Sequence, residues 1–320
     1  MQSSSSPTHD LPSPRSGSTS REGEPDTEPI AGGVGISARN LAELETLGYR
    51  HLAALEPGGA LHVAEHAEHG IVAVKLGRRS DSKREQRRFE REARMLGERR
   101  HPNVVAVLDA ATLHEGRPFV VMEYLAGVDL REALRHLDEP RTLVLQRWAL
   151  DMARGLAAIH DWGILHRDIK PSNLFLSMQD GRTTLKLIDF GLAKPLHREW
   201  GEDSITERGF ACGTPMYMSP EQVRAGPLTA QSDVYSAGVV LYQIASGRPP
   251  FVGPRLEVMS KHLLHCARPV PREIPEPWRR LIRRCLAKEP GERYADGAAL
   301  LAAVEAAASK ASQGANNGAE

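Results

Sequence analysis

Residues 166–173 read His-Arg-Asp-Ile-Lys-Pro-Ser-Asn, and the interpretation of the whole chain starts from this octet. It carries the carboxylate of Asp168, followed two and five residues later by the ammonium of Lys170 and the carboxamide of Asn173. The proline after Lys170 discourages a continuous helix, so we expect a loop that holds the three polar groups together. A base, a cation and a metal-binding oxygen are the groups that phosphoryl transfer needs, because that chemistry depends on positioning and charge stabilisation.

Length and composition limit the classes of protein that the chain can belong to. Its 320 residues favour two lobes or domains plus tails, since about 150 residues per domain is usual. The 41 basic and 41 acidic residues cancel, which gives no basic field for nucleic acid. Three cysteines without a Cys-x-x-Cys spacing indicate neither a disulfide framework nor a cysteine-based zinc site. With no long apolar run and no signal-peptide pattern, we expect a cytoplasmic protein without a membrane span.

The two ends of the chain are predicted to lie outside the folded domain. Residues 1–48 are rich in Ser, Pro, Gly, Thr and Glu, so they bury too little apolar surface to offset chain entropy. We interpret them as a disordered tail, and residues 308–320 as a flexible C-terminal tail. The predicted domain is therefore 49–307.

Periodicity divides this domain into two parts. Five apolar or alternating stretches predict strands, and a charged helix follows a cap-forming Ser-Asp-Ser triplet at 80–82. From residue 128 onward helical spacing dominates, and residues 233–246 are apolar nearly all round, which predicts a buried helix. The predicted strands are 49–55, 60–65, 71–76, 104–111 and 118–123; further helices are expected around 145–159, 278–286 and 296–307.

A second motif gives the octet its partner. Asp189-Phe190-Gly191 begins sixteen residues after Asn173 and follows the apolar stretch 185–188, a strand that would point the carboxylate of Asp189 back at the octet. Together the two motifs resemble the catalytic and metal-binding loops of the eukaryotic-type (Hanks-type) protein kinase family, in its bacterial branch. The resemblance implies an α+β, bilobal fold. Its N-lobe (49–123) has a five-stranded antiparallel sheet and one helix, and a hinge (123–127) leads to a mainly helical C-lobe (128–307).

The resemblance also implies a nucleotide site in the N-lobe. Residues 72–75, Val-Ala-Val-Lys, match the family's strand motif, so Lys75 would hold the α- and β-phosphates of ATP; the alternative is a solvated strand lysine. Glu92 would pair with that lysine, the alternative being an exposed pair with Arg88. Met122 would be the gatekeeper, with the backbone of Glu123 and Leu125 at the adenine edge. The remaining expected ATP contacts are Leu55, Gly58, Val63, Ala73 and Phe175.

In the C-lobe, the resemblance implies chemistry on serine and threonine. Asp168 would take the proton of the substrate hydroxyl, Lys170 would neutralise the γ-phosphoryl group, and Asn173 and Asp189 would hold Mg²⁺ or Mn²⁺. Residues 213–221 match the family's peptide-positioning segment. Lys170 is typical of serine/threonine kinases, and Thr214 in this segment supports that class. The implied function is transfer of the ATP γ-phosphoryl group to protein Ser/Thr hydroxyls in signalling, with autophosphorylation. Expected structural residues are Glu221, paired with Arg293, and Asp233, which would brace the catalytic loop.

The glycine-rich lid departs from the family's pattern. Residues 55–63 read Leu-Glu-Pro-Gly-Gly-Ala-Leu-His-Val, so Glu56 and Leu61 replace two glycines that let the backbone approach phosphates. We expect weaker ATP binding or altered lid closure. The departure leaves a pseudokinase scaffold as the alternative function, and a small-molecule phosphotransferase as a third. The catalytic set is complete, with Lys75, Glu92, Asp168, Asn173 and Asp189, and this argues against a pseudokinase. A small-molecule phosphotransferase is disfavoured by the presence of Lys170, residues 213–221 and Arg293.

Regulation is predicted from the residues around the octet. In this family the arginine that precedes the catalytic aspartate, here Arg167, binds a phosphate on the activation loop. Ser204 and Thr206 are the candidate acceptors of that phosphate; the alternative is that they are unmodified polar residues. A regulatory partner could act through the N-terminal tail. The sequence leaves the physiological substrate, the upstream signal and the oligomeric state open.

Overall fold

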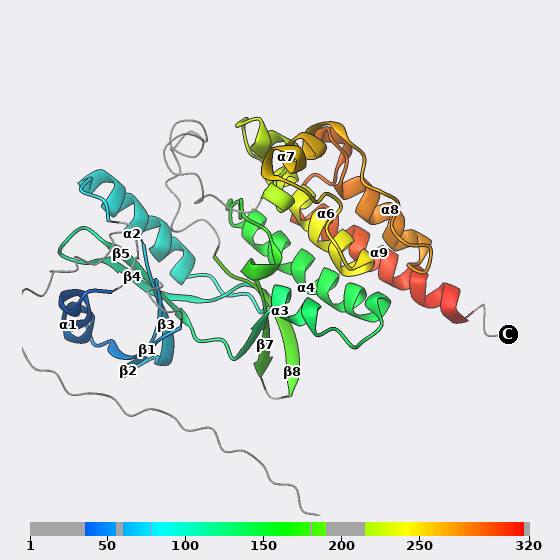
Figure 1. Ribbon diagram of the computed structural model, residues 1–320. Coiled ribbons are helices and arrows are strands. Elements are labelled where there is room, and N and C mark those ends of the chain that lie inside the picture. Colours follow the sequence, from blue (N-terminus) through cyan, green and yellow to red (C-terminus); the bar gives the residue numbers. More distant parts are fainter. Residues whose placement is uncertain (1–35, 56–59, 78, 180, 190–214, 317–320) are drawn as a thin grey trace, which may run out of the picture. The chain divides into compact units, whose positions relative to one another are not determined.

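The computed structural model describes residues 36–55, 60–77, 79–179, 181–189 and 215–316. Its N-terminal part contains one five-stranded sheet in which every neighbouring pair is antiparallel, in the order β1-β2-β3-β5-β4 (Figure 1). The predicted sheet is confirmed. β4 begins three residues later than predicted, and Val104 instead forms an isolated bridge with Leu187. The strands are β1 (Arg50–Ala54), β2 (Leu61–His66), β3 (Gly70–Leu76), β4 (Val107–Thr112) and β5 (Pro118–Glu123).

Two helices accompany this sheet, one more than expected. α2 (Lys83–Gly97) is the predicted charged helix, and it packs on β4 and β5. α1 (Ala38–Thr46) lies inside the stretch expected to be a disordered tail, so that expectation is wrong for residues 38–46. Ser37 caps α1, and Leu44, only 2% exposed, joins the apolar cluster on one face of the sheet. Residues 1–35, which were also expected to be disordered, lie outside the described residues.

The C-terminal part is mainly helical, as predicted. A small sheet of β6 (Gly127–Asp129), β7 (Leu174–Gln179) and β8 (Arg182–Leu187) lies beside it, of which the sequence indicated only the end of β8. The helices are α3 (Leu130–Arg135), α4 (Arg141–Asp161), α5 (Pro220–Val223), α6 (Ala230–Ser246), α7 (Arg255–Leu264), α8 (Glu276–Cys285) and α9 (Gly297–Asn316). The described residues of this part also form three short 3-10 turns: η1 (Pro171–Asn173), η2 (Pro215–Tyr217) and η3 (Pro290–Glu292).

α4, α6, α8 and α9 pack closely around one core. α4 and α9 lie side by side over much of their length (Figure 1). α6 approaches α8 so closely that a Cβ on Gly238 would lie 2.4 Å from Cβ of Cys285, which explains the glycine in a buried helix. α9 also runs on through residues expected to form a flexible tail, because Ala307 is buried and Ala311 packs on the core. The expectation is wrong for residues 308–316.

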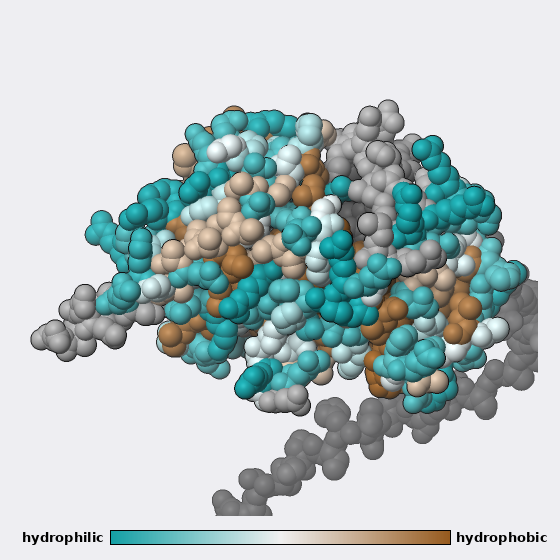
Figure 2. Space-filling view, turned by 180° about the vertical axis from the view of Figure 1, so that it is seen from behind, coloured by the Kyte–Doolittle hydropathy of each residue, from teal (hydrophilic) through white to brown (hydrophobic). Residues whose placement is uncertain are grey.

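The main apolar core joins the two lobes, since it includes Val120 and Met122 of β5 as well as residues of α4, α6 and α8. The face in Figure 2 is mostly hydrophilic, and its hydrophobic residues form separate small groups. Within the described ranges, no helix combines the length and the apolar character that crossing a membrane requires.

Candidate functional site

The octet forms a loop between α4 and β7, and it ends in η1, whose first residue is Pro171. Nζ of Lys170 lies 3.1 Å from Oδ2 of Asp168, and Nδ2 of Asn173 donates to the carbonyl of Asp168 over 2.8 Å. The side chains of Asp168 and Lys170 are about a quarter exposed, while Asn173 is buried. The structure therefore brings the three predicted polar groups together at a partly solvent-facing point.

A strained backbone at Arg167 is held by contacts on both sides. Its φ of 65° lies in the left-handed region, which costs free energy in a non-glycine residue unless the surroundings fix it. The N–H groups of His166 and Arg167 donate to the two carboxylate oxygens of Asp233, over 2.7 and 2.8 Å. Nε2 of Gln222 donates to the carbonyl of Arg167 over 2.8 Å. Asp233, 2% exposed on α6, thus lies where a brace of the loop was expected.

The octet is also tied to the strand that precedes Asp189. Nε2 of His166 lies 3.1 Å from the carbonyl of Ile188, and the N–H of Ile188 donates to the carbonyl of Asn173 over 3.0 Å. Asp189 itself has a φ of 63°, a second left-handed residue. Its Oδ1 lies 2.5 Å from Nζ of Lys75, which comes from β3 of the other lobe.

The expected adenine-binding residues lie in register across the N-lobe sheet. Ala73 on β3 pairs with Val63 on β2 and with Met122 on β5, so the three side chains share one face. The backbone N–H of Glu123 is already used, because it donates to the carbonyl of Ala106. The backbone carbonyl of Glu123 can still accept an N–H from a ligand. Leu125, on the same connection, is partly buried against the core.

The other predicted contacts are distributed less evenly. Phe175 lies half-buried on β7, and Leu55, which follows β1, is 45% exposed. Gly58, Ser204, Thr206 and Thr214 lie outside the described residues. Glu92 lies on α2, but its side chain is outside the described part, so its expected pairing with Lys75 stays a prediction.

Glu221 and Arg293 form a buried, two-pronged ion pair. Nη1 and Nη2 of Arg293 lie 2.7 and 3.0 Å from the two carboxylate oxygens of Glu221. The remaining N–H groups of Arg293 donate to the carbonyls of Ala287, Gln231 and Lys288, so every donor of the guanidinium is used. Burial would raise the pKa of Glu221, but the hydrogen bonds and charge of Arg293, with Ser232, hold that pKa below its ordinary value.

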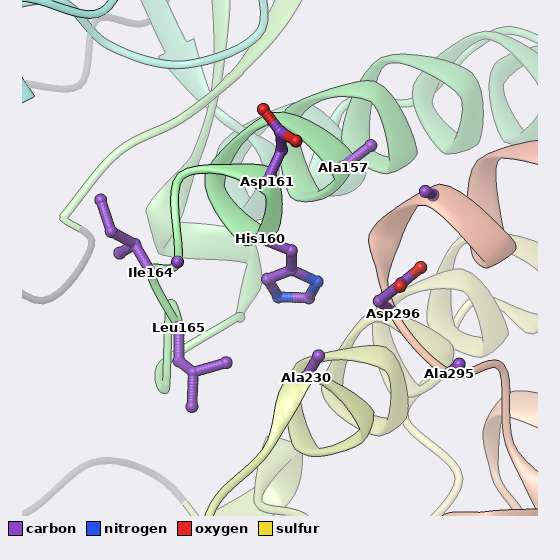
Figure 3. Close-up of a pocket in the computed structure, with 10 residues that line it drawn as sticks. Ala157, His160, Asp161, Ile164, Leu165, Ala230, Ala295 and Asp296 are labelled. Atoms are coloured by element: carbon purple, nitrogen blue, oxygen red, sulfur yellow. The ribbon is translucent and has the colours of Figure 1, made fainter.

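The site contains positioning residues that we did not predict. His160 at the end of α4 accepts the N–H of Gly297 at Nδ1 over 2.9 Å, so its proton is on Nε2, 3.0 Å from Oδ2 of Asp233. Figure 3 shows its ring directed towards α6 and α9, beside a cavity of about 450 Å³ that Asp161 and Asp296 also line. The sequence offered one sign of this role: His160 is a polar residue next to the apolar face of α4.

A second unpredicted contact fixes the hinge. Nζ of Lys186, on β8, lies 2.7 Å from Oε1 of Glu123, and the same oxygen accepts the N–H of Ala106. Lys186 is 8% exposed, which is unusual for a lysine and is compensated by this pairing. The strand leading to Asp189 is thereby joined to the expected adenine-binding connection.

Comparison with known proteins agrees with this geometry. Residues 56–305 match the family model described as the protein kinase domain. The chain is 36% identical over 248 residues to serine/threonine-protein kinase pkn3 of Myxococcus xanthus, which covers 74% of this chain and 45% of that relative. It is 37% identical over 248 residues to PknB of Mycolicibacterium smegmatis (73% and 38%), and 34% identical over 268 residues to PkaA of Streptomyces coelicolor (83% and 46%). The chain spans less than half the length of these curated relatives.

Proposed function

Since this chain belongs to the protein kinase family, we propose that it transfers the γ-phosphoryl group of ATP to serine and threonine hydroxyls of proteins, including its own. One observation carries the proposal. Asp168, Lys170 and Asn173 contact one another in the octet, and the octet is bonded to the strand that ends at Asp189, which is paired with Lys75. The relatives named above are serine/threonine-protein kinases, which supports the substrate class. Residues 49–307, extended by α1 and the end of α9, are proposed as the kinase domain.

In this proposal Asp168 is the base. Its carboxylate is partly exposed, so a substrate hydroxyl can approach it and pass it a proton. Lys170 lies beside the same carboxylate and supplies a positive charge where the γ-phosphoryl group must sit during transfer. The contacts of Asp233 and Gln222 with the backbone of Arg167 keep both side chains at one end of the loop.

The residues present suit ATP with a divalent metal. Asp189 and Asn173 offer carboxylate and amide oxygens, the ligands that Mg²⁺ prefers, and either Mg²⁺ or Mn²⁺ is proposed. When bound, the metal would neutralise charge on the phosphates. Lys75 lies at hydrogen-bond distance from Asp189, so its ammonium is placed to hold the α- and β-phosphates. Val63, Ala73, Met122 and Phe175 are proposed to enclose the adenine.

Regulation is proposed through Arg167. Its Nε is buried and has no hydrogen-bond partner among the described residues, so the guanidinium is suited to bind a phosphate added elsewhere on the chain. Ser204, Thr206 and Thr214 are the proposed activation-loop residues. A cytoplasmic location and a partner that acts through the N-terminal tail complete the proposal.

The proposal is tested by incubating the full chain with ATP, Mg²⁺ and a generic basic protein, and by mapping phosphosites. Lys75→Met is the matched variant, because it removes the phosphate-binding charge at similar length. We expect Mg²⁺-dependent phosphoserine or phosphothreonine with the wild type and at least about a hundredfold less with Lys75→Met. Nucleotide binding without any transfer would instead identify a pseudokinase.

A further inference from the structure

The segment η2 is held in place by three side chains from helices behind it. Nε2 of His262, on α7, lies 3.1 Å from the carbonyl of Met216. The hydroxyl of Ser236 donates to the carbonyl of Tyr217 over 2.7 Å, and the hydroxyl of Tyr217 donates to Oε1 of Gln243 over 2.7 Å. The carbonyls of Met216 and Tyr217 are therefore both held by side chains of the helices, His262 and Ser236.

His262 is the middle of a chain of hydrogen bonds whose direction is fixed by its ends. A carbonyl can only accept, so Nε2 of His262 carries a proton and donates to Met216. In a neutral imidazole Nδ1 then accepts, and the hydroxyl of Tyr235, 2.9 Å away, must be its donor. The oxygen of Tyr235 in turn accepts from Nζ of Lys288, an ammonium that can only donate, over 3.3 Å.

The surroundings keep His262 in this neutral, single-tautomer form. Its side chain is fully buried, and the ring of Phe251 packs edge-on against it with centroids 4.9 Å apart. Burial, together with the positive charge of Lys288, lowers the pKa of His262 to about 4. Lys288 also donates to the carbonyl of His262 over 2.8 Å, which fixes the backbone of α7 at that residue. The Arg293 guanidinium lies over the ring of Tyr235, and the carboxylate of Glu221, which is paired with Arg293, also acts on that tyrosine.

We propose that His262 is a positioning residue for the protein substrate: by holding the carbonyl of Met216, it sets the path of residues 215–217, which face the acceptor peptide. The inference rests on the proposed kinase function, in which residues 213–221 position that peptide. The segment has a direct link to the catalytic loop, since α5 begins three residues after η2 and its Gln222 binds the carbonyl of Arg167. A shift of Met216 would therefore move the acceptor peptide relative to Asp168, while the ATP contacts stay in place.

The test is a steady-state comparison of His262→Leu, His262→Gln and the wild type, with His265→Leu as matched control. His265 is an exposed residue at the end of α7. Leucine keeps the bulk but removes the donor, so we expect KM for a peptide substrate to rise about tenfold, the factor for one lost hydrogen bond, with KM for ATP within twofold. Glutamine can still donate to Met216 and should restore most of the difference. An unchanged peptide KM in a folded His262→Leu variant would overturn the proposal, as would equal changes in both KM values.

A second measurement keeps the inference testable if leucine prevents folding or if no phosphorylation occurs. Tyr235→Phe keeps the ring and removes the donor to Nδ1, so it should raise the peptide KM by a smaller factor in the same direction. Hydrogen exchange of the amides of residues 215–223 needs no activity. Faster exchange there in Tyr235→Phe and in folded His262 variants, but not in His265→Leu, supports positioning even if the wild type transfers no phosphate, which would refute only the proposed function. Exchange equal to that of the wild type would refute the role of His262.

Discussion

Asp168 is placed by the backbone that precedes it. The left-handed conformation of Arg167 turns the chain, and Asp233 and Gln222 bind the N–H and the carbonyl of that residue. The carboxylate of Asp168 remains partly exposed beside Lys170. The strained residue is therefore Arg167, and the residue proposed for the chemistry is its neighbour Asp168.

Asp168→Asn should lower kcat without loss of stability. Asparagine has nearly the same shape but cannot accept a proton as a carboxylate does, and a general base contributes about 10²–10⁴-fold. We expect kcat for protein phosphorylation to fall by about that factor, with the melting temperature within about 2 °C of the wild type. The measurement is single-turnover phosphorylation at saturating ATP, and a wild-type rate would show that Asp168 is not the base.

His262 should make the stability of the protein depend on pH in the acid range. Its pKa is about 4 in the folded protein, below the ordinary value of about 6.5, so the unfolded chain binds the extra proton first. This contribution is fully present above about pH 6.5 and is lost as the pH falls towards 4, by at most about 3 kcal/mol. Urea unfolding between pH 7.5 and 4.5 should show this loss in the wild type and a smaller one in His262→Gln. Parallel curves would contradict the expectation.

At the scale of elements, α6 supports both halves of the site. Its first turn carries Asp233, which binds the octet, and its second turn carries Ser236, which binds η2, and Tyr235, which binds His262. The helix can do so because it is buried on almost every side, which fixes its position against α4 and α8. A single buried helix therefore sets the distance between the catalytic loop and the segment beside it.

Asp233→Asn should weaken the protein and its activity together. The amide has one oxygen for two backbone N–H groups, so at least one of them loses its acceptor, at a cost of about 1–3 kcal/mol. Arg167 can then relax from its left-handed conformation, which should lower kcat. Urea unfolding and phosphorylation rates check this, with Asp138→Asn, an exposed position, as control. If activity fell in both variants equally, the brace would not be the cause.

Arg293→Met should be among the most destabilising single changes. It leaves the carboxylate of Glu221 buried without its counter-charge and frees three carbonyls, and breaking a buried ion pair costs about 3–5 kcal/mol. The exposed Arg280–Glu276 pair offers a contrast, since Arg280→Met should change stability by less than about 1 kcal/mol. The comparison is made by urea unfolding at pH 7.5, and equal effects would show that burial of the pair is unimportant.

For the whole molecule, the described N-terminal boundary of the domain is α1. Asn40 and Leu44 are buried, and Nδ2 of Asn40 donates to Oε1 of Glu115 over 2.7 Å. The helix thereby covers one edge of the apolar cluster that includes Tyr49 and Phe119. A domain that began at residue 49 would expose this edge.

Two truncated variants test this boundary. One begins at residue 36 and the other at residue 49, each after a starting methionine. We expect the first to keep the wild-type unfolding free energy within about 0.5 kcal/mol, and the second to lose at least about 2 kcal/mol, the value of burying one leucine. Leu44→Ala in the full chain should reproduce much of that loss. Equal stability of the two truncations would show that α1 is dispensable.

The features that could be predicted are those that depend on residues close together in the sequence. The octet, the strand before Asp189 and the five-stranded sheet depend on short-range spacing and alternation. α1 was missed because only a few apolar residues interrupt a polar composition, and its stability comes from burial of Leu44 in the apolar cluster and from contacts with the distant residues His114 and Glu115. The end of α9 was missed for a similar reason, since Ala-rich sequence reads as a tail until α4 is placed beside it. His160 and Gln222 carry no motif, because their partners lie 73 and 55 residues away in the chain.

The sequence by itself determined the family, the fold class and the identity of the polar groups proposed for phosphoryl transfer, because these depend on residue types at fixed short spacings. Tertiary structure alone decided which other residues support the site: Gln222 and His160 around the catalytic loop, Lys186 at the hinge and His262 behind Met216. The physical reason is that a hydrogen bond between distant residues requires both partners to be brought within about 3 Å, and this depends on how the helices and strands pack together.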